Sequence, residues 1–120
     1  MNEASDLVDR LVAREATVAS AESLTGGRLA ARLTEAPGSS RTFLGGVVTY
    51  ATEAKRGVLD VPEEIVERFG VISEECARAM AEGARRLFGS TYALSTTGVA
   101  GPDTQEDKPV GTVFVGLAGP

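Results

Sequence analysis

The sequence contains no histidine and no tryptophan, and it has a single cysteine, Cys76. Without histidine, imidazole is excluded as a metal ligand, a general base or a pH switch. One cysteine cannot form a disulfide within the chain, and Cys76 lies on the apolar face of an expected helix, where it should be buried and inert. Aromatic residues make up only 5% of the sequence, which argues against a base-stacking surface for single-stranded nucleic acid.

Charge and hydropathy exclude further classes of protein. The formal net charge is −5, so the field of the protein repels phosphate backbones, and no direct nucleic-acid partner is expected. No apolar run is long enough to cross a membrane, and no signal peptide is recognisable. The acidic residues at 60–67 are typical of a solvated helix face rather than of a metal site. We therefore expect a cytoplasmic protein with no membrane partner.

The chain has 120 residues, a length typical of one domain with one hydrophobic core. Short apolar runs predict strands at 17–21, 43–50, 92–97 and 111–118, and helical spacing of apolar residues predicts helices at 2–14, 28–33, 54–59, 62–70 and 73–89. No helix separates the last two strands, so these two should pair antiparallel. We predict an α/β fold, a three-layer α/β/α sandwich with a mixed, mostly parallel sheet, formed by residues 1–120 as a single domain.

In such a sheet, ligands bind beyond the carboxyl ends of the parallel strands, and three segments are expected there. The first is the turn AESLTGG at residues 21–27, which leads from a strand into a helix. Free N–H groups at the start of that helix can hold a phosphate, or can stabilise an oxyanion beside Ser23 as a nucleophile. An ordinary helix cap is the simpler interpretation of the same residues, and both interpretations stay open.

The second segment runs from Tyr50 to Lys55, and the third is the turn TGVAGP at residues 97–102. Lys55 is either a solvated surface lysine or, if its ammonium group is desolvated beside Ser23, a base whose lowered pKa lets it remove the hydroxyl proton. Tyr50 relays a proton or holds the ligand, or it packs on the rim of the site. The turn at 97–102 offers hydroxyl and backbone donors, which by itself is weak support for a site.

Six segments together resemble the CinA C-terminal domain family. In chain order they are AESLTGG (21–27), PGSS (37–40), GGVVTY (45–50), EAKR (53–56), TGVAGP (97–102) and KPVGTV (108–113). The resemblance extends over residues 17–118 and is far more specific than any single segment. It implies an amidohydrolase that deamidates nicotinamide mononucleotide to nicotinic acid mononucleotide and ammonia, in pyridine nucleotide (NAD) recycling.

The resemblance also implies roles for particular residues. Ser23 falls on the family's nucleophile and Lys55 on its base, and Tyr50 matches a further position of the active site. The positions expected to bind the substrate are Thr25, Gly26, Gly27, Ser39, Ser40, Thr97, Gly98 and Gly101. A serine–lysine acyl-enzyme mechanism requires no metal ion and no cofactor, and it accounts for a hydrolase without histidine.

Members of the family usually continue with another strand that carries basic residues and with a closing helix. We expect residues 1–120 to lack this last strand and helix, which would leave the apolar run at 113–117 as an exposed sheet edge. The larger amino-terminal domain of some members is expected to be missing as well. An exposed edge and the habit of the family both favour a homodimer.

A non-catalytic module is the alternative hypothesis. The family is historically associated with competence and DNA damage, so the domain would then bind a nucleotide or a protein in that response. Binding of the mononucleotide without release of ammonia would distinguish such a module from the amidase.

Overall fold

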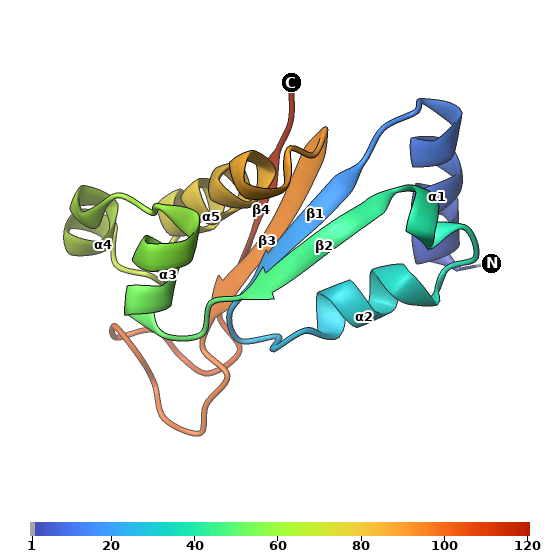
Figure 1. The fold of residues 1–120 in the computed structure, drawn as a ribbon. Coiled ribbons are helices and arrows are strands. Elements are labelled where there is room, and N and C mark those ends of the chain that lie inside the picture. Colours follow the sequence, from blue (N-terminus) through green and yellow to red (C-terminus); the bar gives the residue numbers. More distant parts are fainter. Residues whose placement is uncertain (1) are drawn as a thin grey trace.

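A four-stranded sheet forms the middle of the molecule in the computed structural model, which describes residues 2–120 (Figure 1). Its strands are β1 (Val18–Glu22), β2 (Phe43–Val48), β3 (Tyr92–Gly98) and β4 (Val113–Ala118), and they lie in the order β2-β1-β3-β4. β1 pairs parallel with β2 and β3, whereas β4 pairs antiparallel with β3. The predicted mixed, mostly parallel sheet is confirmed.

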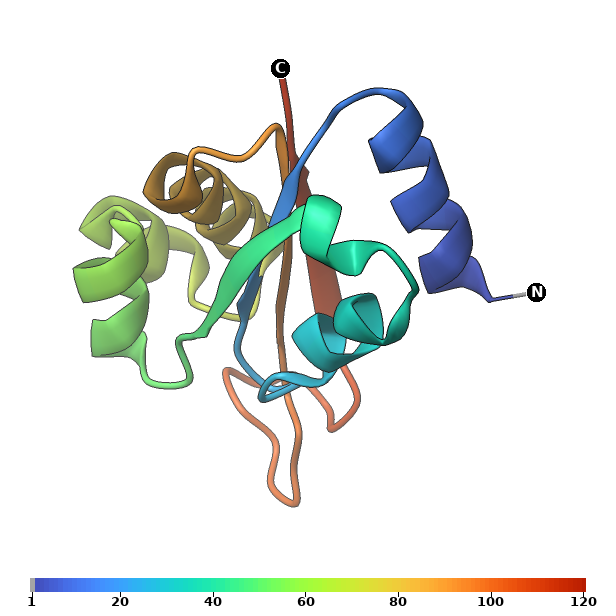
Figure 2. The same cartoon turned by 45° about the vertical axis from the view of Figure 1, so that its right-hand side comes forward.

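Helices cover both faces of this sheet, as Figure 2 shows with the sheet seen nearly edge-on. One face carries α3 (Thr52–Leu59), α4 (Glu63–Phe69) and α5 (Glu74–Phe88). The other carries α1 (Glu3–Ala13) and α2 (Arg28–Glu35), and a short 3₁₀ helix, Ser39–Arg41, follows α2. The three layers agree with the α/β/α sandwich expected from the sequence.

The helix ends follow the local chemistry of the sequence. The Asn2 side chain accepts hydrogen bonds from the amides of Ala4 and Ser5 at the start of α1, and the Ser73 hydroxyl accepts one from the amide of Cys76 at the start of α5. These are N-caps that satisfy donors left free in the first helical turn. α5 ends at Gly89, whose φ of 64° lies in the left-handed region that favours glycine.

The larger part of the core lies between α5 and the sheet and is built mostly from small side chains. Ala19, Ala21 and Ala93 of the strands are fully buried there, against Cys76 and Met80 of α5. Small side chains let the helix pack close to the sheet, which agrees with the low aromatic content of the sequence. The prediction that Cys76 packs in the core is confirmed.

Both outer strands of the sheet expose apolar side chains. On β4, Val115 is 68% exposed and Leu117 is 66% exposed, so the run at 113–117 does form an apolar edge. Among residues 2–120, no helix has the length and apolar character needed to span a membrane. The carboxyl ends of β1, β2 and β3 lie together at the opposite end of the sheet from the chain's carboxyl terminus, next to α3 and to the loop that joins β3 to β4 (Figure 1).

Candidate active site

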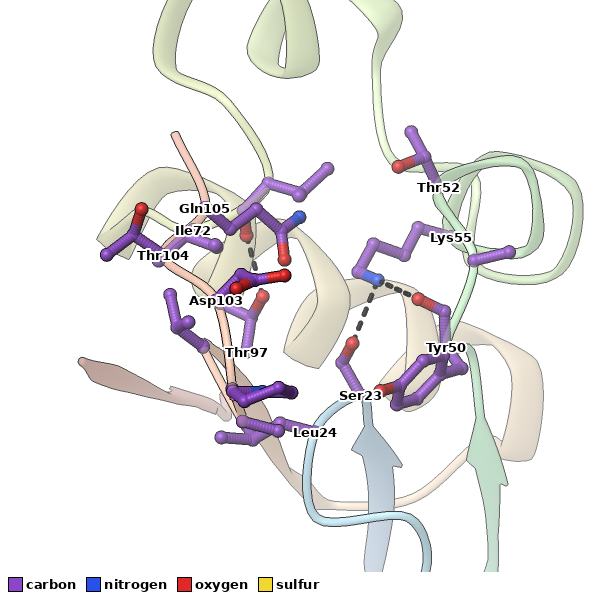
Figure 3. A pocket seen from close by; sticks show the side chains of 17 residues that line it. Ser23, Leu24, Tyr50, Thr52, Lys55, Ile72, Thr97, Asp103, Thr104 and Gln105 are labelled. Atoms are coloured by element: carbon purple, nitrogen blue, oxygen red, sulfur yellow. Dashed lines mark hydrogen bonds between the residues drawn. The ribbon is translucent and has the colours of Figure 1, made fainter. Parts of the chain in front are cut away.

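The carboxyl ends of β1 and β2 bring Ser23 and Lys55 together. Ser23 follows β1 directly, and Lys55 lies in the first turns of α3, which begins shortly after β2. The Lys55 Nζ and Ser23 Oγ atoms are 3.0 Å apart and hydrogen bonded, as Figure 3 shows. Residues 32 positions apart in the sequence therefore form one polar pair.

The Lys55 side chain is almost completely enclosed, with 1% of its surface exposed. Its Nζ atom donates to the carbonyl oxygens of Thr49 at 2.8 Å and Tyr50 at 3.1 Å, both at the end of β2. Within residues 2–120, no carboxylate lies within 4.0 Å of this nitrogen. The interpretation of Lys55 as a solvated surface residue is therefore wrong.

Desolvation by burial lowers the pKa of Lys55 from its ordinary value of 10.5, because it disfavours the charged form. The negative charges of the Cys76 and Glu106 side chains raise the pKa of Lys55, and these two effects are smaller than that of burial. When Lys55 is neutral, its two N–H bonds can point to the carbonyls of Thr49 and Tyr50, and its lone pair then faces the Ser23 hydroxyl. This arrangement suits a lysine that accepts a proton from serine.

Ser23 and Lys55 lie at the wall of a cavity of about 470 Å³, a size typical of sites for small molecules. The cavity opens between the end of β2, the start of α3 and the loop that joins β3 to β4. Lys55 and Asp103 are the charged side chains among the described residues that line it. The lining residues are Ser23, Leu24, Tyr50, Ala51, Thr52, Lys55, Val71, Ile72, Thr97, Gly98, Val99, Ala100, Gly101, Pro102, Asp103, Thr104 and Gln105.

The structure thus brings together six of the site residues expected from the sequence. Ser23, Lys55 and Tyr50 lie on one side of the cavity, and Thr97 lies on the other (Figure 3). Gly98 and Gly101 continue that second wall. The Thr97 hydroxyl is buried and donates to the Val71 carbonyl at 2.6 Å, so its proton is engaged within the protein while its oxygen can still accept. Tyr50 is 66% exposed and lies at the rim.

Thr25, Gly26 and Gly27 do not line the cavity, because Glu22 uses this turn as a helix cap. The buried Glu22 carboxylate accepts hydrogen bonds from the Thr25 hydroxyl and from the amides of Gly27, Leu29 and Ala30. The expectation of free N–H groups at the start of α2 is therefore wrong at these positions. Gly26 and Gly27 have φ values of 57° and 111°, so they allow the turn to curl around Glu22 rather than admit a ligand.

Ser39 and Ser40 lie far from this cavity within the chain. They belong to the 3₁₀ helix that leads into the amino-terminal end of β2, whereas Ser23 follows the carboxyl end of β1. Because β1 and β2 are parallel, these are opposite ends of the sheet. The expected grouping of Ser39 and Ser40 with Ser23 is not formed.

Sequence reasoning also missed several residues that shape the site. Glu22 ends β1, several residues before the N-cap Gly27 of α2, so no local pattern marks it as the residue that caps this helix. The carbonyls of Thr49 and Tyr50 carried no signal either, because backbone groups have no sequence signature. Within residues 2–120, no group of three or more cysteine and carboxylate side chains lies close enough to hold a metal ion.

Comparison with known proteins adds a family to this geometry. Residues 2–120 match the family model described as the CinA C-terminal domain. A CinA-like protein from Frankia casuarinae is 58% identical over 110 residues, which are 92% of this chain and 25% of that protein. A competence-damaged protein (CinA) superfamily structure from Escherichia coli superposes with a TM-score of 0.91 at 36% identity, covering 95% of this chain and 67% of that one. The competence damage-inducible protein A from Klebsiella pneumoniae gives a TM-score of 0.91 at 37% identity, covering 95% and 71%. The chain spans about a quarter of the length of the curated relatives it matches.

Proposed function

The chain belongs to the CinA C-terminal domain family, and from this membership and the Ser23–Lys55 pair we propose that it is an amidohydrolase. The proposed reaction is deamidation of nicotinamide mononucleotide to nicotinic acid mononucleotide and ammonia. The substrate is proposed from the family resemblance, and the mechanism from the geometry of the cavity. The single observation that carries the proposal is the 3.0 Å contact between the Lys55 amine and the Ser23 hydroxyl.

The burial of Lys55 supports a chemical role rather than a structural one. Removing an ammonium group from water costs free energy unless an opposite charge compensates it. Here its hydrogen-bond partners are two carbonyls and the Ser23 hydroxyl, all neutral groups. An apolar side chain would fill the same space at lower cost, so the lysine is best explained by the proton that it can take from Ser23.

The reaction then proceeds by acyl transfer in two steps. Neutral Lys55 takes the hydroxyl proton as Ser23 Oγ attacks the carboxamide carbon, and the resulting ammonium gives that proton to the leaving nitrogen, which departs as ammonia. Water attacks the ester in the second step. Lys55 takes a proton from this water and returns it to Ser23 Oγ as nicotinic acid mononucleotide leaves. The Ser23 amide is bonded to the Thr96 carbonyl, so we assign the oxyanion in both steps to the amides of Leu24 and Gly98, which line the cavity.

Substrate binding is assigned to the wall formed by Thr97, Gly98 and Gly101, with Tyr50 at the rim. Gly98 and Gly101 offer backbone groups, and Tyr50, Thr52 and Thr104 offer hydroxyls to the same cavity, whereas the Thr97 hydroxyl already donates to the Val71 carbonyl. Such neutral donors can hold an anionic phosphate in a protein whose overall charge is negative.

A homodimer remains a prediction, which light scattering on the purified protein checks.

Release of ammonia from nicotinamide mononucleotide by the purified chain tests the proposal. Wild-type protein should be active, whereas Ser23→Ala and Lys55→Ala should each reduce kcat by at least about a thousandfold. Arg56→Ala is a matched control, because Arg56 follows Lys55 in α3 but pairs with Glu63 rather than with Ser23. Full activity in both site variants would remove the assignment. Binding without turnover in calorimetry would instead favour the non-catalytic module.

A further inference from the structure

The loop that joins β3 to β4 forms one wall of the cavity, and a carboxylate of this loop bonds it to the segment between α4 and α5. Residues 101–105 of this loop line the cavity, and Glu106 follows them. The Glu106 Oε2 atom accepts a hydrogen bond from the Val71 amide at 2.9 Å, and its Oε1 atom accepts one from the Ile72 amide at 2.9 Å. Val71 and Ile72 lie in the segment that joins α4 to α5, and they also line the cavity.

The backbone around Glu106 is adapted to this contact. Glu106 and Asp107 have φ values of 52° and 59°, a left-handed conformation that costs free energy in residues other than glycine. On the other side, Gly70 has a φ of 80°, and a Cβ atom there would lie 2.5 Å from Glu106 Oε1. Glycine at position 70 therefore leaves the space that the carboxylate occupies.

The segment Val71–Ile72, which donates to Glu106, also forms a hydrogen bond with β3. The Thr97 hydroxyl donates to the Val71 carbonyl at 2.6 Å, and the side chains of Val71 and Ile72 are buried in the core. Both groups of the Val71 backbone are thus bonded to residues that flank or form the β3–β4 connection. The two walls of the cavity are joined through this one dipeptide.

We propose that Glu106 is a positioning residue that holds the wall formed by residues 101–105 against Val71 and Ile72, so that the cavity is preformed for its ligand. The kinetic part of this inference rests on the proposed amidase function. Its structural part does not, because the Val71 and Ile72 amides report on the contact whether or not the protein turns over a substrate. Preformed walls reduce the entropy that is lost when a ligand binds.

Glu106 also acts on Lys55 through its charge. The groups near Lys55 that carry or can carry charge are Cys76 of α5 and Glu106 of the loop, and Asp103 and Tyr50 line the same cavity. The negative charge of Glu106 raises the pKa of Lys55, but the lowering of this pKa by desolvation is larger. Neutralising Glu106 should therefore lower the pKa of Lys55 further.

The experiment compares Glu106→Gln with Asp107→Asn. Both changes replace a carboxylate by an amide in adjacent residues, and asparagine tolerates the left-handed conformation. In Glu106→Gln, hydrogen exchange at the Val71 and Ile72 amides should accelerate by about tenfold or more, since the NH2 group replaces one of the two oxygens that accept from these amides and itself faces a donor. KM for the mononucleotide should rise by about tenfold with kcat changed less than about threefold, and the rising limb of the activity profile should move to lower pH. Asp107→Asn should change none of these.

A second variant, Gly70→Ala, acts on the same contact from the other partner, because its Cβ would lie 2.5 Å from Glu106 Oε1, and the φ of 80° also strains any side chain at this position. It should accelerate exchange at Val71 and Ile72 and raise KM in the same direction. Unchanged exchange at both amides in Glu106→Gln and Gly70→Ala would overturn the inference, whatever the activity. Active wild-type protein with the same KM and pH profile in Glu106→Gln would also overturn it and leave the amidase function intact. Inactive wild-type protein with faster exchange in both variants would overturn the proposed function and retain the positioning role.

Discussion

Glu22 and Ser23 are adjacent in the sequence, but their side chains bond to helices on opposite faces of the sheet. The Glu22 carboxylate accepts from the first amides of α2, whereas the Ser23 hydroxyl contacts Lys55 of α3. Successive side chains of a strand point to opposite faces, so the end of β1 places a helix cap on one side and a nucleophile on the other. The turn that carries Ser23 is held in place by the residue before it.

Replacement of Glu22 by glutamine should destabilise the fold. The carboxylate is buried and accepts four hydrogen bonds, and an amide nitrogen in its place would face donors. We expect Glu22→Gln to lower the free energy of unfolding at pH 7 by about 3 kcal/mol, measured by urea denaturation. Glu35→Gln, an exposed carboxylate at the end of α2, is the matched control and should change it by less than about 0.5 kcal/mol.

The effect of Glu22→Gln should also depend on pH. Burial acts to raise the pKa of Glu22, but the bonds from Thr25, Ala30, Leu29 and Gly27 outweigh it, and the net direction is below the ordinary value of 4.5. A carboxyl group whose pKa is lowered by folding stabilises the protein above its unfolded pKa, and this contribution is lost as the pH falls through the folded value. The difference between wild type and variant should be full at pH 7 and should narrow below pH 4.5. A difference that is constant down to pH 3 would contradict this account.

Most of the fold could be predicted from the sequence, because its strands and helices are set by local patterns. Predicted and observed strands differ by at most two residues at their ends, and the antiparallel pairing of β3 with β4 followed from the missing helix between them. α3 begins at Thr52, two residues before the predicted start, since Ala51 makes no side-chain cap bond that would mark the boundary. The 3₁₀ helix at Ser39–Arg41 was not expected, because three residues are too few for a periodic pattern.

The site could be predicted only in part, because its key contacts link distant segments. Residue types alone left two interpretations of Lys55 open, a surface lysine and a catalytic base. The burial of its side chain excludes the surface lysine. The bonds from its nitrogen to Thr49 and Tyr50 depend on where β2 ends relative to α3. The glycines after Thr25 suggested a loop that binds a ligand. In the structure, the amides at the start of α2 donate to the Glu22 carboxylate instead.

The proposed amidase should become more active as the pH rises. Lys55 acts as a base only when neutral, and burial lowers its pKa from 10.5, so the fraction of active protein should grow with pH and level off below that value. The logarithm of kcat/KM should rise with unit slope before the plateau. Lys55→Arg should abolish activity throughout the range, because guanidinium does not deprotonate in proteins. A flat profile from neutral to alkaline pH would exclude Lys55 as the base.

Cys76 should resist alkylation in the folded protein. Its side chain is fully buried, and burial raises the pKa of the thiol to about 11, with the charge of Lys55 acting in the opposite direction. Because the thiolate is the reactive form, iodoacetamide at pH 8 should modify native protein at least about a hundredfold more slowly than protein in urea. Similar rates in both states, followed by mass spectrometry, would show that α5 does not shield this residue.

A covalent intermediate on Ser23 should be detectable if the two-step mechanism operates. Attack by the serine forms an ester with the pyridine carboxyl group, and a small nucleophile other than water can intercept it. Hydroxylamine added to the reaction should therefore yield the hydroxamate of nicotinic acid mononucleotide, with ammonia still released in equal amount to substrate consumed. Wild-type protein without the mononucleotide, and Ser23→Ala with it, should form no hydroxamate under the same conditions. Ammonia release without any hydroxamate, across a range of hydroxylamine concentrations, would favour direct attack by water and would assign Lys55 to activating that water rather than Ser23.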